Sequence, residues 1–417
     1  MLLLSACAPS VEVPGDPDGL DSVEEIGGVE ETVDIYELPA DMPTVEVIIT
    51  AEAMARLDAD PYLAEDETGT FVDGTGRSYE VDLNYRGAYA LKSVMAYYDL
   101  RNWKVKFGQD DDYLSRREWN FNYEPHFRQK LAYDLFRFAG VEVPSAQHVV
   151  LLLNGSYQGM YLQYEDPDSK GWLDDSFGDD GGDLYKAATD LPGVPQCFAD
   201  LTVLGSEDAD YDCHYQKKTN HKDAPGDFGV LRSFIDGLAQ SDPAWFEESF
   251  EVQSFLAYLV VSNFIANWDS YPQRPKNYWL YEGPRRVVFI PWDLDGTFNP
   301  NVDATFNQMG TTASVFFELF GDDYDPPHES EGNERPLVHR LLADPDVEAA
   351  YLAKYREVVE VLANPDYLQP RLEALTEIVD PHISETDRAR LGPSNDSLLY
   401  FVQQRHGVVS AELDSLQ

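Results

Sequence analysis

The sequence has few cysteines and few basic residues, and it lacks the common phosphate-binding loops. Its 417 residues include three cysteines, and 30 Lys and Arg residues stand against 76 Asp and Glu residues, giving a formal net charge of −46. A surface this acidic repels nucleic acid and anionic membranes. No GxxxxGK[ST], GxGxxG or GxSxG motif occurs, and the missing glycine-rich loop counts against an ordinary protein kinase.

Long apolar runs are also missing, because no segment reaches the ~18 apolar residues of a transmembrane helix. At the amino terminus, Leu4-Ser5-Ala6-Cys7 matches the bacterial lipobox, in which the cysteine receives a lipid. The alternative is a chance match. We interpret residues 1–7 as the remnant of a lipoprotein signal and residues 8–40 as an acidic, disordered tether. The sequence therefore predicts an exported lipoprotein of the bacterial cell envelope or surface, which touches the membrane only through its lipid anchor.

The remaining two cysteines lie in one irregular stretch, residues 188–226. With Cys7 lipidated, Cys197 and Cys213 are left as a pair, and disulfides persist in oxidising compartments outside the cytoplasm. We expect these two cysteines to form a disulfide, with two free thiols as the alternative.

A β-hairpin signal lies near the middle of the chain. Lys276–Tyr281 is rich in aromatic residues, Glu282-Gly283-Pro284 is a turn, and Arg285–Pro291 is rich in β-branched residues. Antiparallel pairing across this turn would place position 281 opposite 285, and 277 opposite 289.

Oxygen-bearing side chains gather at the open end of this predicted hairpin. Asn277 and Asp293 would emerge there together, Asp269 lies in the preceding loop, and Asp295 follows two residues after Asp293. Such oxygens suit Mg²⁺ bound together with phosphate. Protein kinases use the same order of a catalytic Asp, a metal-binding Asn, a hairpin and a metal-binding Asp. However, Asp269 and Asn277 are eight residues apart (277 − 269), and neither a preceding His-Arg nor an Asp-Phe-Gly is present.

These motifs resemble the CotH kinase family, the atypical kinases similar to spore coat protein H. The resemblance lies in Asn267-Trp268-Asp269, in Lys276–Tyr281 and above all in Ile290–Phe298 (IPWDLDGTF), and with upstream matches it covers roughly residues 80–320. It implies transfer of phosphate from ATP, with Mg²⁺ or Mn²⁺, to Ser or Thr hydroxyls of a protein. Asp269 would be the catalytic residue, Asn277 and Asp293 would bind metal, and Asp295 competes with Asp293 for that role.

Candidate nucleotide-binding residues lie upstream of the hairpin. Arg86 ends a predicted strand, and Lys104 and Lys106 share one face of another. Glu165 ends a third predicted strand. Lys186 belongs to a short LYK strand that resembles the one in the family. After Arg86-Gly87 the family has small polar residues, whereas this sequence has Ala88–Ser93. The sequence therefore does not decide whether this loop contacts phosphate. For the two strand lysines the alternative is an exposed edge-strand charge, and for Glu165 a solvated strand end.

The pattern of elements predicts an α+β class with an atypical protein-kinase-like fold of two lobes. Residues 41–417 would form the domain, with a mixed or antiparallel sheet in the N-lobe, about 41–165, and a mainly helical C-lobe, about 166–417. We expect a monomer that binds a nucleotide and an unidentified protein substrate. One alternative is a catalytically weak, kinase-like binding or structural protein of the envelope. The other is a metal-dependent hydrolase, which the lack of histidine ligand spacing disfavours.

Overall fold

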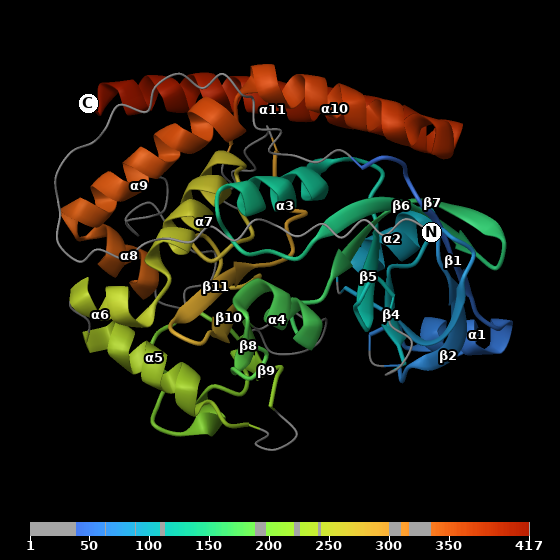
Figure 1. Ribbon diagram of the computed structural model, residues 1–417, viewed down its shortest axis with the longest axis horizontal. Helices are drawn as coiled ribbons and strands as arrows, with labels where there is room; N and C mark the ends of the chain where they lie inside the picture. Colours follow the sequence, from blue (N-terminus) through green and yellow to red (C-terminus); the bar gives the residue numbers. More distant parts are fainter. Residues whose placement is uncertain are drawn as a thin grey trace. The chain divides into compact units, whose positions relative to one another are not determined.

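Seven strands close into a barrel in the order β1-β2-β3-β4-β5-β7-β6 (Figure 1). The computed structural model describes residues 39–62, 64–87, 89–108, 113–187, 197–220, 226–240, 243–299, 310–316 and 335–416, and Leu38–Gln417 form one compact unit. Cys7 and the predicted tether lie outside the described residues. The barrel strands are β1 (Thr44–Ile48), β2 (Glu67–Val72), β3 (Ser78–Tyr85), β4 (Trp103–Phe107), β5 (Glu118–Tyr123), β6 (Ala146–Leu153) and β7 (Ser156–Glu165).

The α+β class is confirmed, but the closure of this sheet was not expected. β1 pairs antiparallel with β2 and parallel with β6, where Thr44 lies opposite Val150. A closed barrel leaves no unpaired sheet edge, so the edge-strand interpretation of Lys104 and Lys106 is wrong.

Aromatic side chains fill the barrel. The rings of Phe71, Phe107, Tyr113 and Phe121 are buried, and their centroids lie 5.1–5.6 Å from a neighbouring ring. Along β4, Trp103, Val105 and Phe107 are buried in this core, whereas the two lysines between them are half-buried. The two-residue period of a strand thus sends Lys104 and Lys106 to the outer face of the barrel.

A second, four-stranded sheet has the order β11-β10-β8-β9. Its strands are β8 (Leu184–Ala187), β9 (Tyr215–Lys217), β10 (Tyr278–Glu282) and β11 (Val287–Pro291). The buried helix α7 (Val252–Phe264) packs against β11, where the Phe289 ring lies 4.5 Å from that of Tyr258, and it also contacts α3 and α9 (Figure 1). An almost wholly apolar helix is stable only when it is covered in this way.

The hairpin forms at the predicted place with a different register. Tyr278 pairs with Pro291 and Tyr281 with Val288, so position 281 does not lie opposite 285 as expected. The turn is longer than predicted, because the backbone N–H of Gly283 donates to the carbonyl of Arg286 at 3.1 Å. Asn277 directly precedes β10, and Asp293 follows two residues after the end of β11. Both residues therefore still lie at the same open end of the hairpin.

The other helices surround the two sheets. They are α1 (Ala51–Ala59), α2 (Tyr89–Tyr98), α3 (Arg128–Phe138), α4 (Lys170–Phe177), α5 (Gly229–Gln240), α6 (Pro243–Ser249), α8 (Pro336–Leu342), α9 (Pro345–Glu357), α10 (Pro365–Val379) and α11 (Glu385–Ser415). Short 3₁₀ helices at Asp208–Asp210 and Asp380–His382 and a π-helical segment at Val358–Leu362 complete them. In the part of the chain that the structure describes, no helix combines the length and apolar character needed to cross a bilayer.

Two glycines provide a matched test of the barrel. A Cβ atom added to Gly69 in β2 would lie 2.7 Å from the carbonyl oxygen of Ile48, whereas one added to Gly392 in α11 would meet nothing within 4 Å. We expect Gly69→Ala to lower the free energy of unfolding by roughly 1–3 kcal/mol through overpacking. Gly392→Ala should raise it by about 1 kcal/mol, because alanine favours the helix. Urea unfolding of both variants measures the two changes, and equal effects would contradict the packing described here.

Candidate active site

The chain that leaves α7 brings Asp269 to the hairpin. Asn277 donates from its side-chain amide to the Asp269 carboxylate at 2.9 Å and to the Asp269 backbone carbonyl at 2.8 Å. Lys276 forms an ion pair with the same carboxylate at 3.1 Å. These contacts fix Asp269 beside Asn277. They use the amide nitrogen of Asn277, so its Oδ1 oxygen takes no part in them.

Asn277 and Asp293 both adopt left-handed backbone conformations, with φ of 57° and 55°. Asn and Asp tolerate this region better than other non-glycine residues. The two residues are coupled, because the backbone N–H of Trp292 donates to the carbonyl of Asn277 at 3.0 Å. Two adjacent left-handed residues at the end of one hairpin are the kind of local strain that gathers at functional sites.

Three carboxylates share this end of the hairpin. Burial and then Asp269 raise the pKa of Asp293, while Arg86 and Lys186 oppose the rise. Burial, Asp293 and Asp269 hold the pKa of Asp295 well above its ordinary value. The Asp295 residue is nevertheless exposed at the surface, so water reaches it. Carboxylate and amide oxygens are of the kind that divalent cations bind. Among the described residues, however, the carboxylates whose oxygens lie within 4.8 Å of one another in a group of three are Glu118, Asp166 and Asp168, and not those of Asp269, Asp293 and Asp295.

Arg86 lies between the barrel and this carboxylate group. It donates to the Asn122 side chain at 2.6 Å and to the Tyr164 hydroxyl, and its guanidinium lies 5.0 Å from the Tyr164 ring centroid and 5.8 Å from that of Trp292. Tyr164 and Asp293 raise its pKa against the effect of burial. A permanently charged group therefore faces Asp293 without a direct ion pair to any described carboxylate.

Lys186 approaches the same carboxylates from β8. Its ammonium lies 5.2 Å from the Trp279 ring centroid and 5.8 Å from that of Trp292, and it forms no ion pair with a described residue. Burial and the neighbouring Lys218 lower its pKa to about 8. An amine in this setting gains charge stabilisation when an anion binds beside it.

Three other predicted residues have protein partners. Lys104 forms ion pairs with Glu118 at 2.6 Å and Asp166 at 3.2 Å, and Lys106 forms one with Asp66 at 2.6 Å. Glu165 accepts hydrogen bonds from Arg116 at 2.9 Å and from the backbone N–H of Ser145 at 3.2 Å. Within the described part of the chain, none of these three side chains forms a hydrogen bond or ion pair with Asp269, Asn277 or Asp293.

An acidic cluster beside Lys104 was not predicted from the sequence. Glu118, Asp166 and Asp168 offer carboxylate oxygens within 4.8 Å of one another. Burial and Asp166 raise the pKa of Asp168 to about 6, whereas Lys104 and Lys218 keep that of Asp166 below its ordinary value despite burial. Lys104 and Lys218 neutralise much of this charge through ion pairs. The run Glu165-Asp166-Pro167-Asp168 after an apolar strand is the signal that could have revealed the cluster.

The structure joins Cys197 and Cys213 in a disulfide, and the loop that it closes packs on the segment between Asp269 and β10. The backbone N–H of Ala199 donates to the Pro275 carbonyl at 3.0 Å, and the Tyr278 hydroxyl donates to the Ala199 carbonyl at 2.5 Å. The Tyr271 hydroxyl donates to the Asp200 carbonyl at 2.9 Å. The loop therefore supports the backbone on both sides of Asn277.

Comparison with known proteins gives a family relationship. The sequence profile of a family described as CotH kinase protein matches residues 83–407. The chain is 21% identical over 393 residues to the inner spore coat protein H of Bacillus subtilis (strain 168), which covers 90% of this chain and 99% of that protein. It is 29% identical over 147 residues to invasin CotH2 of Rhizopus delemar, covering 34% of this chain and only 23% of the invasin.

Two solved structures show weak similarity. The HipA, HipB and operator DNA complex of Shewanella oneidensis MR-1 contains a chain that matches with a TM-score of 0.38 and 13% identity, covering 91% of this chain and 75% of that one. The proinflammatory kinase CtkA of Helicobacter pylori matches with a TM-score of 0.34 and 9% identity, covering 75% and 93% of the two chains. Both scores are too low to define this fold.

The disulfide should stabilise the supporting loop measurably. The two cysteines are 16 positions apart, and closing a loop of this length is worth about 3 kcal/mol of unfolding free energy. Replacing both Cys197 and Cys213 by Ser should therefore lower stability by about that amount and speed hydrogen exchange at the Ala199 amide. As a control, a reductant should lower the melting temperature of the wild type and leave that of the double variant unchanged.

Proposed function

The chain belongs to the CotH kinase protein family, and we propose that it transfers the γ-phosphoryl group of ATP to Ser or Thr hydroxyls of an extracytoplasmic protein. The observation that supports this most directly is the contact of Asn277 with Asp269 at 2.9 Å, at the hairpin end where Asp293 also emerges. Kinase-type phosphoryl transfer uses a carboxylate that activates the hydroxyl, followed in the chain by an amide and a carboxylate that bind metal.

Each side chain has a distinct task in this proposal. Asp269, oriented by the amide of Asn277, accepts the proton of the attacking hydroxyl. The Oδ1 of Asn277 and the carboxylate of Asp293 would bind Mg²⁺ or Mn²⁺, with Asp295 as a further oxygen ligand. The bound cation would neutralise charge that develops on the transferring phosphoryl group. Because little covalent chemistry falls to the protein, positioning and charge neutralisation supply most of the rate.

Lys186 and Arg86 are the cations best placed to bind the phosphates. Both lie beside Asp293, and aromatic rings rather than carboxylates surround their charges. Lys104 would have to leave Glu118 and Asp166 to reach a phosphate, and Lys106 would have to leave Asp66. We therefore assign phosphate binding to Lys186 and Arg86 rather than to Lys104 or Lys106.

We also propose that the protein acts outside the cytoplasm as a monomeric, lipid-anchored envelope protein. The Cys197–Cys213 disulfide supports this location, because such bonds persist in oxidising compartments. The lipidated residue would be Cys7. Mass spectrometry of the protein purified from bacterial membranes would detect a diacylglyceryl group on that cysteine, and a free amino-terminal tail without lipid would contradict the anchor.

Asp269→Asn is the sharpest test of the transfer reaction. The amide cannot accept the hydroxyl proton, so we expect phosphate incorporation from γ-labelled ATP into casein to fall by a factor on the order of 100 to 10,000. The shape of the side chain is preserved, and the melting shift caused by ATP and Mg²⁺ should therefore remain. Unchanged incorporation would remove Asp269 from the mechanism. An ATP-dependent melting shift with no transfer by the wild type would instead favour the binding protein.

Lys186 should make ATP use depend on pH. Its protonated form binds phosphate, and its pKa of about 8 lies below the ordinary lysine value, so the charge is lost as pH rises through 8. We expect kcat/KM for ATP to decline from about pH 8 upward, because this ratio reports the free enzyme. Lys186→Arg keeps its charge and should flatten the profile. Lys106→Arg is the matched control and should leave the decline in place.

A further inference from the structure

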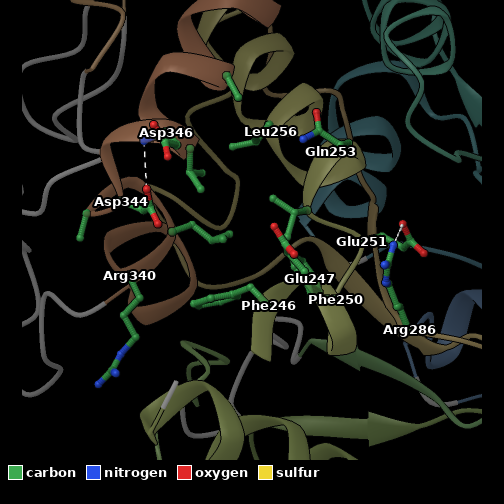
Figure 2. Close-up of a pocket in the computed structure, with 15 residues that line it drawn as sticks. Phe246, Glu247, Phe250, Glu251, Gln253, Leu256, Arg286, Arg340, Asp344 and Asp346 are labelled. Carbon is green, nitrogen blue, oxygen red and sulfur yellow. Dashed lines mark hydrogen bonds and ion pairs between the residues drawn. The ribbon is translucent and has the colours of Figure 1, made fainter. Parts of the chain in front are cut away.

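A groove separate from the candidate active site lies at the N-terminal end of α7. It has a volume of about 750 Å³, and its lining residues come from α6, the start of α7, the β10–β11 turn, α8 and α9 (Figure 2). This volume lies within the range of ligand-binding clefts, roughly 300–1,000 Å³. None of its lining residues belongs to the group around Asp269.

The floor of the groove is apolar. Phe246, Phe250, Leu256 and Leu341 are buried hydrophobic side chains that line it. Ala350 on α9 is half-buried and also faces the groove. A floor of this kind accepts a leucine-sized or aromatic side chain of a ligand, because burial of such a group removes apolar surface from water.

The rim of the groove is acidic. Four carboxylates line it, from Glu247, Glu251, Asp344 and Asp346, against two guanidinium groups. Arg286 already forms an ion pair with Glu251 at 3.5 Å. The second guanidinium, that of Arg340, points away from the space between the other labelled side chains in Figure 2. A ligand therefore meets uncompensated negative charge above an apolar floor.

Charge also decides which occupant fits. The segment 317–334, which precedes α8 in the sequence, contains seven Asp and Glu residues and no Lys or Arg, so the acidic rim would repel it. A second copy of the chain brings a net charge of −46 and is repelled in the same way. A cationic segment of another protein is complementary to both the rim and the overall field.

We propose that this groove docks a segment of the protein acceptor in which apolar side chains alternate with Lys or Arg. The inference rests on the proposed phosphoryl transfer, whose acceptor it describes. The 13 residues of α7 separate the groove from the chain that carries Asp269, a distance of about 20 Å. An extended acceptor would therefore need at least about six residues between its docking segment and its hydroxyl.

The test measures binding without nucleotide, so its result does not depend on whether phosphate is transferred. The probe is a fluorescein-labelled peptide of about 12 residues in which Leu and Lys alternate, followed by fluorescence anisotropy. Glu247→Gln with Asp346→Asn should weaken its binding about tenfold. Glu80→Gln with Glu377→Gln removes the same charge from exposed positions elsewhere and should weaken it less than twofold. Equal weakening by both pairs would overturn the groove as the site.

A second variant tests the apolar floor without changing charge. Ala350→Trp fills the groove from α9 and should abolish binding of the Leu and Lys peptide. The proposal would be overturned if this variant still bound the peptide. It would also be overturned if the wild type bound a matched peptide of alternating Leu and Glu equally tightly. If transfer occurs, the Ala350→Trp protein should retain its rate on a short Ser peptide that lacks a docking segment. A loss of that rate would show that the variant disturbs the fold, and the charge-pair comparison then decides alone.

Discussion

The double hydrogen bond from Asn277 to Asp269 is the interaction on which the candidate site depends. One amide binds both the side chain and the backbone of Asp269, and the backbone carbonyl of the same Asn277 accepts from Trp292. A single residue thus connects the end of α7 with both strands of the hairpin. The left-handed backbone of Asn277 directs its amide toward Asp269. The left-handed backbone of Asp293 turns the chain after β11 toward the same residues. The backbone cost of these conformations, of order 1–3 kcal/mol each, is balanced by the surrounding packing.

The charge pattern around this interaction supports the proposed binding of an anionic nucleotide by a protein that is itself so acidic. Lysines that face carboxylates directly, such as Lys104 beside Glu118 and Asp166, are already neutralised. Lys186 and Arg86 are placed against Trp and Tyr rings instead. An aromatic face attracts a cation without cancelling its net charge. The aromatic residues therefore keep two positive groups available beside Asp293.

Much of this arrangement could be predicted from local sequence, and the rest depends on long-range pairing. The hairpin signal was sufficient to place Asn277 and Asp293 at one end, although the register was wrong because the turn extends to Arg286. Closure of the barrel requires β1 to pair in parallel with β6, and nothing in the period of either strand specifies that partner. The partners of Lys104 were missed for the same reason, since Glu118 and Asp166 come from two other strand ends. Alternation along β4 did predict that both lysines share one face.

The segment from Asp269 to Asn277 illustrates why distant parts of the chain matter to the site. Outside helices and strands, backbone groups must find hydrogen-bond partners elsewhere. Here the disulfide-closed loop supplies the N–H of Ala199 to Pro275, and Arg335, just before α8, donates to the carbonyls of Tyr271 and Gln273 at 2.8 and 3.2 Å. An error of about 1 Å in the position of a catalytic group can cost a hundredfold in rate. The cysteine pair and Arg335 are therefore as much a part of the site's geometry as the motif residues, although neither touches Asp269.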